Sequence, residues 1–500
     1  MTLLRRGVAV LSLALGLSFV EIEVTAAANT ASPNDPISKP KCSSGKSVSV
    51  RYSAGSKRLY LEASSRGACI TIKEVWEHLG GKAPLYAVDA SSGDVSKSIT
   101  GTWLLTESLY VEDGVILQVH GSSAGGDVDE LRLESTSSHY INVRAHGGSL
   151  DFVGTKVFGW DTPKNTYDKK HSDGRSYISA ISEVIMDSAE SCSGKAKNEM
   201  GEARMDIEDS EIAYLGYYQA ESYGLSWKVR GYCKDDSNPE LFERVGVYGN
   251  IYNSDIHHLY FGVYSFGHQQ GDWRNNKVHN NVGYGFDPHD DSDFVTIHDN
   301  KVYNNGNHGI IASKRCHGIS IQGNEVYGSD SVGIFLHLSS DDAHVKNNNV
   351  HDNDDAGIAI LESFDADVSG NTLKDNKYGI RLSVGSADNV FSKNTISGSS
   401  EYSVYLYEGN DEPESVSSPR PKSNVFKGNA ITGGGESMRV ADSDGTQFID
   451  NTFEDPATTR FDDCTDTLMS GNTGLDGVKI KVVHGACFDK GSDSSYKPKC

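Results

Sequence analysis

The chain has 500 residues, of which 46 are Lys or Arg and 69 are Asp or Glu, giving a formal net charge of -23 at pH 7. This acidity argues against a nucleic-acid partner, because phosphate backbones need a basic surface. A hydrophobic content of 37% with a mean hydropathy of -0.45 excludes a polytopic membrane protein. The 52 glycines indicate a turn-rich β protein.

The N-terminus has the pattern of a secretory signal peptide over residues 1–28. Two arginines precede an apolar run over residues 8–20, which is too short to cross a bilayer. A membrane anchor is the alternative interpretation. Residues 29–42 contain three prolines and are expected to form an extended linker. We therefore expect a secreted protein of the extracellular matrix or cell wall, with no membrane attachment once the signal is removed.

The cysteines favour disulfides over a metal site. Their number is even, their spacing is wide and no Cys-x-x-Cys pair occurs, so zinc is not indicated. We expect Cys464 to pair with Cys487 or Cys500 and to tie down the C-terminal end, while the other pairings stay open. The eight cysteines are Cys42, Cys69, Cys192, Cys233, Cys316, Cys464, Cys487 and Cys500.

An internal repeat runs through the second half of the chain. An Asn followed two residues later by an apolar residue recurs every 23 or 24 residues from Asn276 to Asn394, and the series resumes at Asn429. A Gly followed by a large apolar residue keeps step with it from Gly285 to Gly379. Short β-like runs fill each unit, which is too short for a propeller blade. The repeat predicts an all-β fold, a right-handed parallel β-helix in which each strand pairs with its equivalent one turn away.

The regions outside the repeat set the expected boundaries. Residues 43–100 do not repeat and form an N-terminal cap region, in which residues 70–79 are expected to be a short amphipathic helix that covers the open first turn. The parallel β-helix is expected over residues 101–487. Residues 408–422 contain three prolines and interrupt the repeat as a surface loop, and residues 488–500 form a polar tail.

The period of two along a strand assigns the faces of the repeat. Positions one and three after each marker Gly should point inward, and positions two and four outward. Aromatic, histidine and cationic side chains then line one long outer face, along which a polymer would lie. The outward residues of interest are Lys228, Tyr264, Asp287, His289, Ser313, His337 and Arg381.

One turn of the repeat carries residues that are unusual for a strand. The segment 284–291 places a Pro in the strand, where it removes a ladder donor, and sets Asp287 and His289 two apart on the outer face. Ordinary turn residues are the alternative interpretation of this segment. In the next turn of the repeat, Ser313 is expected beside His289 and Arg315 beside Asp291. Strand parity places Arg315 on the same face as Ser313, with Lys314 to the side.

These residue types suit inversion at C5 of a uronic acid. The reaction removes a proton next to a carboxylate, so the site needs a cation at that carboxylate, a base on one face of the sugar and a proton donor on the other. Arg offers a bidentate fork and His a base near neutral pH. Tyr can give a proton, or take one if nearby cations lower its pKa. His289, Tyr284 and Arg315 can fill the three roles.

The run from Tyr284 to Asp290 resembles the YG(F/I)DPHD motif of mannuronan C5-epimerases, which convert β-D-mannuronate to α-L-guluronate within alginate. Residues 300–316 strongly resemble the brown-algal type, and the likeness covers roughly residues 200–400. It implies that His289 is the base, Asp287 the motif aspartate and Tyr284 the acid or second base. It also implies that Arg315 neutralises the substrate carboxylate.

The chain departs from the secreted modular bacterial epimerases, which carry an acidic residue at the place of Ser313 and add calcium-binding nonapeptide repeats that this sequence lacks. We expect the partner to be an acidic polysaccharide and the protein to be a monomer. Calcium at Asp341–Asp342 or Asp354–Asp355 is an alternative to plain turn aspartates, and no metal ligand is assigned. The expected substrate-binding residues are Lys314, Lys228, His337, Arg381 and Tyr264.

Three other functions compete with this one. A polysaccharide lyase shares the proton abstraction but then expels the substituent at O4, and it is the nearest alternative. A hydrolase needs paired carboxylates that flank the glycosidic bond, which Asp287, Asp290 and Asp291 could supply, but the two adjacent cations suit carboxylate chemistry better. A non-catalytic solenoid would not need Asp-Pro-His beside Lys-Arg.

Overall fold

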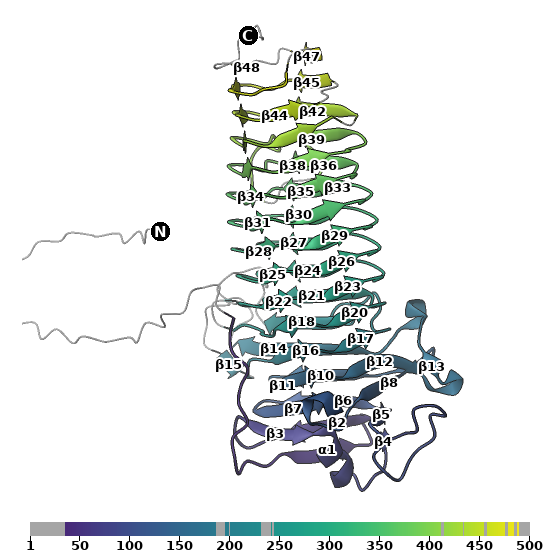
Figure 1. Cartoon of the computed structure of the whole chain (residues 1–500). Helices are drawn as coiled ribbons and strands as arrows, with labels where there is room; N and C mark the ends of the chain where they lie inside the picture. Colours follow the sequence, from purple (N-terminus) through teal and green to yellow (C-terminus); the bar gives the residue numbers. More distant parts are fainter. Residues whose placement is uncertain are drawn as a thin grey trace, which may run out of the picture.

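The computed structural model describes residues 36–186, 196–199, 201–231, 242, 245–411, 415–433, 435–454, 458–475, 479–484 and 488–489. Within these residues the chain winds into a parallel β-helix whose strands stack into three long sheets (Figure 1). The expected signal peptide, the cysteines at 192, 233, 487 and 500, and the expected tail beyond residue 489 lie outside the described residues.

The first sheet, called sheet A, carries the expected functional face. Its strands are β1 (Ser49–Ser53), β2 (Arg58–Glu62), β6 (Ser108–Glu112), β10 (Asn142–His146), β14 (Tyr177–Met186), β15 (Ala196–Glu199), β18 (Gly224–Gly231), β21 (Phe261–Phe266), β24 (Phe286–His289), β27 (Ile310–Ser313), β30 (Ile334–His337), β33 (Ala356–Leu361), β36 (Tyr378–Ser383), β39 (Tyr402–Leu406), β42 (Glu436–Ala441), β45 (Thr458–Asp462) and β47 (Lys479–Val483).

Sheets B and C complete each turn of the solenoid. Sheet B contains β3 (Ala68–Thr71), β7 (Val115–His120), β11 (Ser149–Val153), β16 (Arg204–Glu208), β19 (Ile251–Tyr252), β22 (Asp272–Arg274), β25 (Thr296–His298), β28 (Ser320–Gln322), β31 (His344–Lys346), β34 (Asp367–Ser369), β37 (Val390–Ser392), β40 (Val425–Lys427), β43 (Gln447–Ile449), β46 (Thr467–Ser470) and β48 (Phe488–Asp489). Sheet C contains β4 (Leu85–Ala87), β5 (Thr102–Leu105), β8 (Glu130–Thr136), β12 (Lys156–Asp161), β17 (Glu211–Ala213), β20 (Asp255–His257), β23 (Lys277–His279), β26 (Lys301–Tyr303), β29 (Glu325–Tyr327), β32 (Asn349–His351), β35 (Thr372–Lys374), β38 (Thr395–Ser397), β41 (Ala430–Thr432) and β44 (Thr452–Glu454), with β9 (His139–Tyr140) and β13 (Thr166–Tyr167) on its margin.

The inward and outward faces of sheet A follow the predicted parity. In β27, Ile310 and Ala312 are fully buried in the central core, whereas Ile311 and Ser313 lie on the outer side. The same alternation holds from β24 to β36, so the predicted fold class and face assignment are confirmed. The outer face is nevertheless well packed: Ile311 and its neighbours on later strands form a second apolar cluster with surrounding tyrosines.

The recurring Asn residues form a buried ladder along the solenoid. At Asn324, the side-chain amide donates to the Oδ1 atom of Asn348 (3.0 Å) and to the carbonyl oxygen of Ile297 (2.9 Å). Its own Oδ1 atom accepts from the backbone N–H of Asn300 (2.9 Å). The marker glycines are required by close approach, since a Cβ atom at Gly285 would lie 2.4 Å from the carbonyl oxygen of Gly309. Both markers therefore hold successive turns in register.

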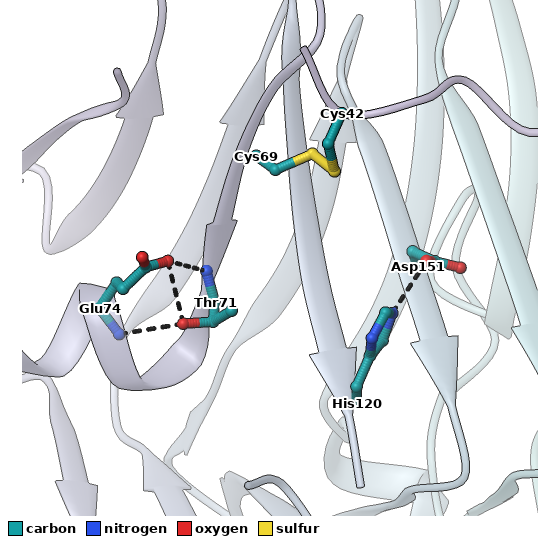
Figure 2. Close-up of a disulfide and its surroundings, with 6 residues drawn as sticks. All are labelled: Cys42, Cys69, Thr71, Glu74, His120 and Asp151. Carbon is teal, nitrogen blue, oxygen red and sulfur yellow. Dashed lines mark hydrogen bonds and ion pairs between the residues drawn. A yellow bond between two sulfur atoms is a disulfide. The ribbon is translucent and has the colours of Figure 1, made fainter. Parts of the chain in front are cut away.

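The N-terminal end is covered by the expected helix, α1 (Ile72–His78). Thr71 caps it: the backbone N–H of Glu74 donates to the Thr71 hydroxyl (3.2 Å), and the Thr71 N–H donates to the Glu74 carboxylate (2.8 Å) (Figure 2). Strands β2 and β3 already pair in parallel with β6 and β7. The expected start of the β-helix at residue 101 is therefore too late, because the non-repeating segment still supplies parallel strands.

The structure contains a disulfide that joins Cys42 to Cys69, next to the capped helix (Figure 2). It ties the residues that precede β1 to the first strand of sheet B. Cys464 is a buried free thiol, so the expected bond to Cys487 or Cys500 is wrong. The reason is its place: Cys464 lies among core residues at the start of a turn rather than at the surface. Cys316 is also a buried free thiol.

Two insertions depart from the regular turns. One lies between β12 and β14 and carries β13, and it projects sideways from the solenoid (Figure 1). The other is the expected loop 408–422, whose described residues fold back toward sheet A, where the N–H of Val416 donates to the Glu362 carboxylate (3.2 Å). No helix among the described residues has the length and apolar character needed to cross a membrane.

Candidate active site

The candidate site centres on β24, where Asp287 and His289 both point to the outer side of sheet A. The parallel register places Asp287 beside Tyr264 of β21 and His289 beside Phe266. On the other side, His289 pairs with Ser313 of β27, as the sequence predicted. Between them, Pro288 interrupts the ladder between β24 and β27, whose recorded pairs are Phe286 with Ile310 and His289 with Ser313.

His289 is held by a network of charges that begins at its own neighbour. Its Nδ1 atom bonds to the carboxylate of Asp290. The Nη2 atom of Arg315 donates to the other oxygen of Asp290 (2.8 Å) and to Asp291 (3.0 Å). Burial opposes the charge on His289, but the hydrogen bond to Asp290 and the charges of Asp287 and Asp290 outweigh it and raise the pKa of His289.

Arg315 and Lys314 do not lie as strand parity predicted. Strand β27 ends at Ser313, and both cations follow it in the left-handed conformation, with φ of 64° for Lys314 and 60° for Arg315. Arg315 turns to the carboxylates of Asp290 and Asp291. The positive charge of Lys314 opposes protonation of both His289 and His337, so Lys314 lies near both imidazoles. The predicted pairing of Arg315 with Asp291 is confirmed. Strand parity does not apply to the two cations, because both follow the end of β27.

Asp287 is buried beneath the face although it points outward. Only 1% of it is exposed, and its Oδ1 atom has no hydrogen-bond partner among the described residues. Burial raises the pKa of Asp287 to about 7, against the opposing effect of His289. Burial, followed by the charge of Asp287, raises the pKa of Tyr264 and Tyr284. In the strand register Asp287 lies beside Tyr264, on the same face as His289.

Tyr284 lies just before β24, at the edge of the outer face. Its ring packs on Phe261 (centroids 4.7 Å apart) and is stacked on His308 (5.5 Å). Burial, followed by the charge of Asp287, raises the pKa of Tyr284 to about 12. The sequence analysis also allowed for nearby cations that lower this pKa, whereas the shift is in the opposite direction. Tyr284 therefore keeps its proton near neutral pH and is suited to donate it.

The other expected substrate-binding residues occupy the same outer face on different strands. Lys228 lies over the ring of Phe266 (4.8 Å) and near Glu221 (3.9 Å). Tyr264 contacts His289 with ring centroids 5.9 Å apart. His337 shares a hydrogen bond with Ser313 (2.8 Å), and burial lowers its pKa to about 4. Arg381 forms an ion pair with Asp355 (3.0 Å), so it is not an isolated cation.

Two features of this face escaped the sequence analysis. His308 precedes its marker Gly just as Tyr284 does, and this register alone could have placed it beside Tyr284. Burial lowers the pKa of His308 to about 3, so it is neutral. Beyond Arg381, a column of one large polar side chain per strand continues in register toward the C-terminal end. It comprises Tyr405, Arg439, Arg460 and Lys481.

The acidic turns considered for calcium have protein partners. Asp355 binds Arg381, and the carboxylate of Asp341 accepts from the backbone N–H of Phe364 (2.9 Å). In the part of the chain that the structure describes, no group of three or more His, Cys, Asp or Glu is arranged to hold a metal ion. Calcium at these turns stays a prediction.

Comparisons with known proteins agree with this architecture. A family model described as "Right handed beta helix region" matches residues 232–350 and 315–418. The mannuronan C5-epimerase AlgG of Azotobacter vinelandii is 25% identical over 205 residues, which is 40% of this chain and 33% of that protein. The match therefore spans a third of the length of that relative.

Solved structures of similar shape include the periplasmic alginate epimerase AlgG, with a TM-score of 0.61, 16% identity, and coverage of 95% of this chain and 100% of that chain. A variant of the same protein superposes with a TM-score of 0.62 and 17% identity over 85% of both chains. At this identity the likeness shows the fold, a right-handed parallel β-helix with strands in the same arrangement.

Proposed function

We propose that this protein is a mannuronan C5-epimerase that converts β-D-mannuronate to α-L-guluronate within alginate. The observation that carries the proposal is the arrangement around β24, where His289, Asp287 and Tyr284 share one outer face with a cation from the next turn. The similarity to AlgG over 205 residues supports the same chemistry. The brown-algal type is proposed from the resemblance of residues 300–316.

In this scheme His289 removes the C5 proton. Its Nδ1 atom is engaged by Asp290, which leaves Nε2 as the nitrogen that accepts a proton. Tyr284 delivers a proton to the opposite face of the sugar, since its pKa of about 12 keeps it protonated. Lys314 stabilises the charge that builds on the substrate carboxylate, and Arg315 fixes Asp290 and thereby orients the base.

The long outer face suits a polymeric substrate. Cations recur on it from Lys228 to Lys481, so successive carboxylates of a polyuronate can be matched along the solenoid axis. An acidic polysaccharide of this kind is a component of the extracellular matrix or cell wall, where a secreted protein can act on it. The disulfide at Cys42 fits an oxidising compartment.

Proton NMR of polymannuronate after incubation with the protein tests the proposal. Guluronate signals are expected with the wild type and not with His289→Ala, whose side chain is on the outer face, so its loss leaves no core cavity. His298→Ala is the matched control, because that imidazole also bonds a following Asp but on sheet B. Guluronate formed at an equal rate by His289→Ala would exclude His289 as the base.

The lyase is the second candidate, because it needs the same base and the same cation. It differs in that the C4–O4 bond breaks and an unsaturated sugar with strong ultraviolet absorbance forms. Shorter chains and rising absorbance without guluronate would favour the lyase. A protonated Tyr284 suits either reaction, since the leaving O4 oxygen of a lyase also needs a proton, and the similarity to AlgG favours the epimerase.

A further inference from the structure

A cavity of about 160 Å³ lies at the ends of sheet C strands, beside the insertion that carries β13. It is lined by Lys169, His171, Arg175, Tyr214, His258, Asn280 and Val282. Of these described lining residues none is acidic, in a chain whose net charge is -23. The cavity is therefore a local concentration of cationic and imidazole groups.

The repeat and the insertion build this cavity together. Tyr214, His258 and Asn280 follow β17, β20 and β23 at equivalent positions, all with a positive φ, and form one wall. The insertion supplies the opposite wall, with His171 in a short 3-10 helix and Arg175 before β14. The tyrosine ring of the first wall is stacked on His258 (4.9 Å). Stacked turns of the solenoid thus fix one wall of the cavity.

Arg175 gives the cavity a buried positive charge. It is 2% exposed, and its three nitrogens donate to the carbonyl oxygens of Gly216 (2.8 Å), Leu215 (2.9 Å) and Asp168 (3.5 Å). The nearby carboxylate of Asp168 accepts from the hydroxyl of Ser135 (2.7 Å). Burial lowers the pKa of Arg175 to about 10, as expected for a cation whose charge is only partly balanced. An anion from solution would complete the balance.

An aromatic surface connects the cavity to the candidate active site. The ring of Tyr260 lies 5.4 Å from His171 in the cavity and 5.2 Å from Phe261, and Phe261 lies 4.7 Å from Tyr284. Next to Tyr260, Tyr218 is 74% exposed, and the two ring centroids are 5.7 Å apart. Exposed aromatic surface that adjoins a cleft marks a binding region, because it is costly to leave in water.

We propose that this cavity is a second binding site for the polymer, in which Lys169 and His171 receive the carboxylate of a uronate residue while Tyr218 and Tyr260 pack against its ring. The buried charge of Arg175 attracts the carboxylate without contacting it. The inference rests on the proposed function, since it takes the polymer to be a polyuronate. The aromatic connection to Tyr284 indicates that the bound residue belongs to the same chain as the sugar at His289. The site then anchors the polymer at a distance from the reacting residue.

Binding of oligomannuronates to the His289→Ala protein tests this site without turnover. Lys169→Gln is compared with Lys170→Gln, which removes the same charge at the next residue. Lys170 is exposed, pairs with Asp173 and does not line the cavity. For a long oligomer, Lys169→Gln should weaken binding about fivefold to tenfold, as for a hydrogen bond to a charged group. Lys170→Gln should change it less than about twofold.

A short oligomer, which covers only β24 and the adjacent strands, should bind both variants equally. Tyr218→Ala should likewise weaken binding of the long oligomer only. Because Tyr218 is exposed, unfolding of the variant would not account for that loss. Equal losses in Lys169→Gln and Lys170→Gln, or equal losses for short and long oligomers, overturn the second site and leave the proposed function standing. If the His289→Ala protein binds neither oligomer, the proposed function fails. A neutral oligoglucan bound as tightly as the uronate overturns carboxylate recognition.

Discussion

The guanidinium of Arg315 donates from Nη2 to an oxygen of Asp290 at 2.8 Å, and the other oxygen of Asp290 binds Nδ1 of His289. The base, the carboxylate and the cation thus form one chain of charges that spans two turns of the solenoid. Arg315 acts on the imidazole through Asp290. We propose that Lys314 takes the role at the substrate carboxylate that the sequence analysis assigned to Arg315.

We expect Asp290→Asn to shift the acidic limb of the pH profile of kcat/KM to lower pH. His289 must be neutral to accept a proton, and its raised pKa keeps it charged to a pH above its usual value of about 6.5. Without the Asp290 charge, burial prevails and the pKa falls, so activity persists at lower pH, although the plateau also drops as the ring loses its orientation. Asp299→Asn removes the matching partner of His298 on sheet B and should leave the profile unchanged.

Lys314→Ala should lower kcat more than Arg315→Ala does. Loss of a cation that faces the developing charge is expected to lower kcat by roughly 10²–10³. Arg315→Ala should retain more activity but alter the pH profile, because Asp290 and Asp291 lose their shared partner. Steady-state kinetics of both variants over a pH series show which variant loses more activity. A larger loss at Arg315 with an unchanged profile would return it to the substrate carboxylate.

The Asn ladder should be the most sensitive part of the solenoid to a single polar substitution. Asn324→Ala removes two donated and two accepted hydrogen bonds in a fully buried stack and leaves Asn300 without its acceptor. We expect a loss of about 2–4 kcal/mol, seen as a lower midpoint in thermal unfolding. Asn349→Ala, on an exposed position of β32, should change stability by less than about 0.5 kcal/mol. Equal midpoints would show that the ladder contributes little.

The sequence sufficed for the repeat and the faces because both follow from fixed periods. The spacing of Asn276 to Asn394 located each turn, and the parity after each marker Gly separated core positions such as Ile310 from face positions such as Ser313. The alternation of inward and outward side chains no longer applies beyond the end of β27. Lys314 and Arg315 lie beyond the end of β27 at positive φ, so alternation no longer determined their directions.

Properties that depend on burial could not be obtained from the order of residues. The pKa of Tyr284 follows from its cover by Phe261 and His308 and from the charge of Asp287, and none of these contacts has a sequence signature of its own. The start of the solenoid was missed for a similar reason. Strands β2 and β3 pair in parallel without the Asn and Gly markers.

The new C5 proton of guluronate should come from the solvent by way of Tyr284. Tyr284 is protonated up to a pKa of about 12, and its hydroxyl exchanges with water between turnovers, so reaction in D₂O should place deuterium at C5 of every guluronate formed. Tyr284→Phe keeps the ring contacts with Phe261 and His308 and removes only the donor, so the rate should fall by on the order of 10²–10⁴ while polymer binding stays unchanged. Tyr303→Phe, on sheet C, keeps the stacking on Tyr327, and as the control it should retain the wild-type rate.

Two outcomes separate the mechanisms at this step. Full activity of Tyr284→Phe would assign the donor to water and leave His289 as the single side chain in proton transfer. Guluronate formed in D₂O without deuterium would mean that one shielded group carries the same proton across the ring. The arrangement around β24 opposes that outcome, because His289 is fixed by Asp290 at one end of the strand while Tyr284 lies before the other end, so neither side chain serves both faces of the sugar.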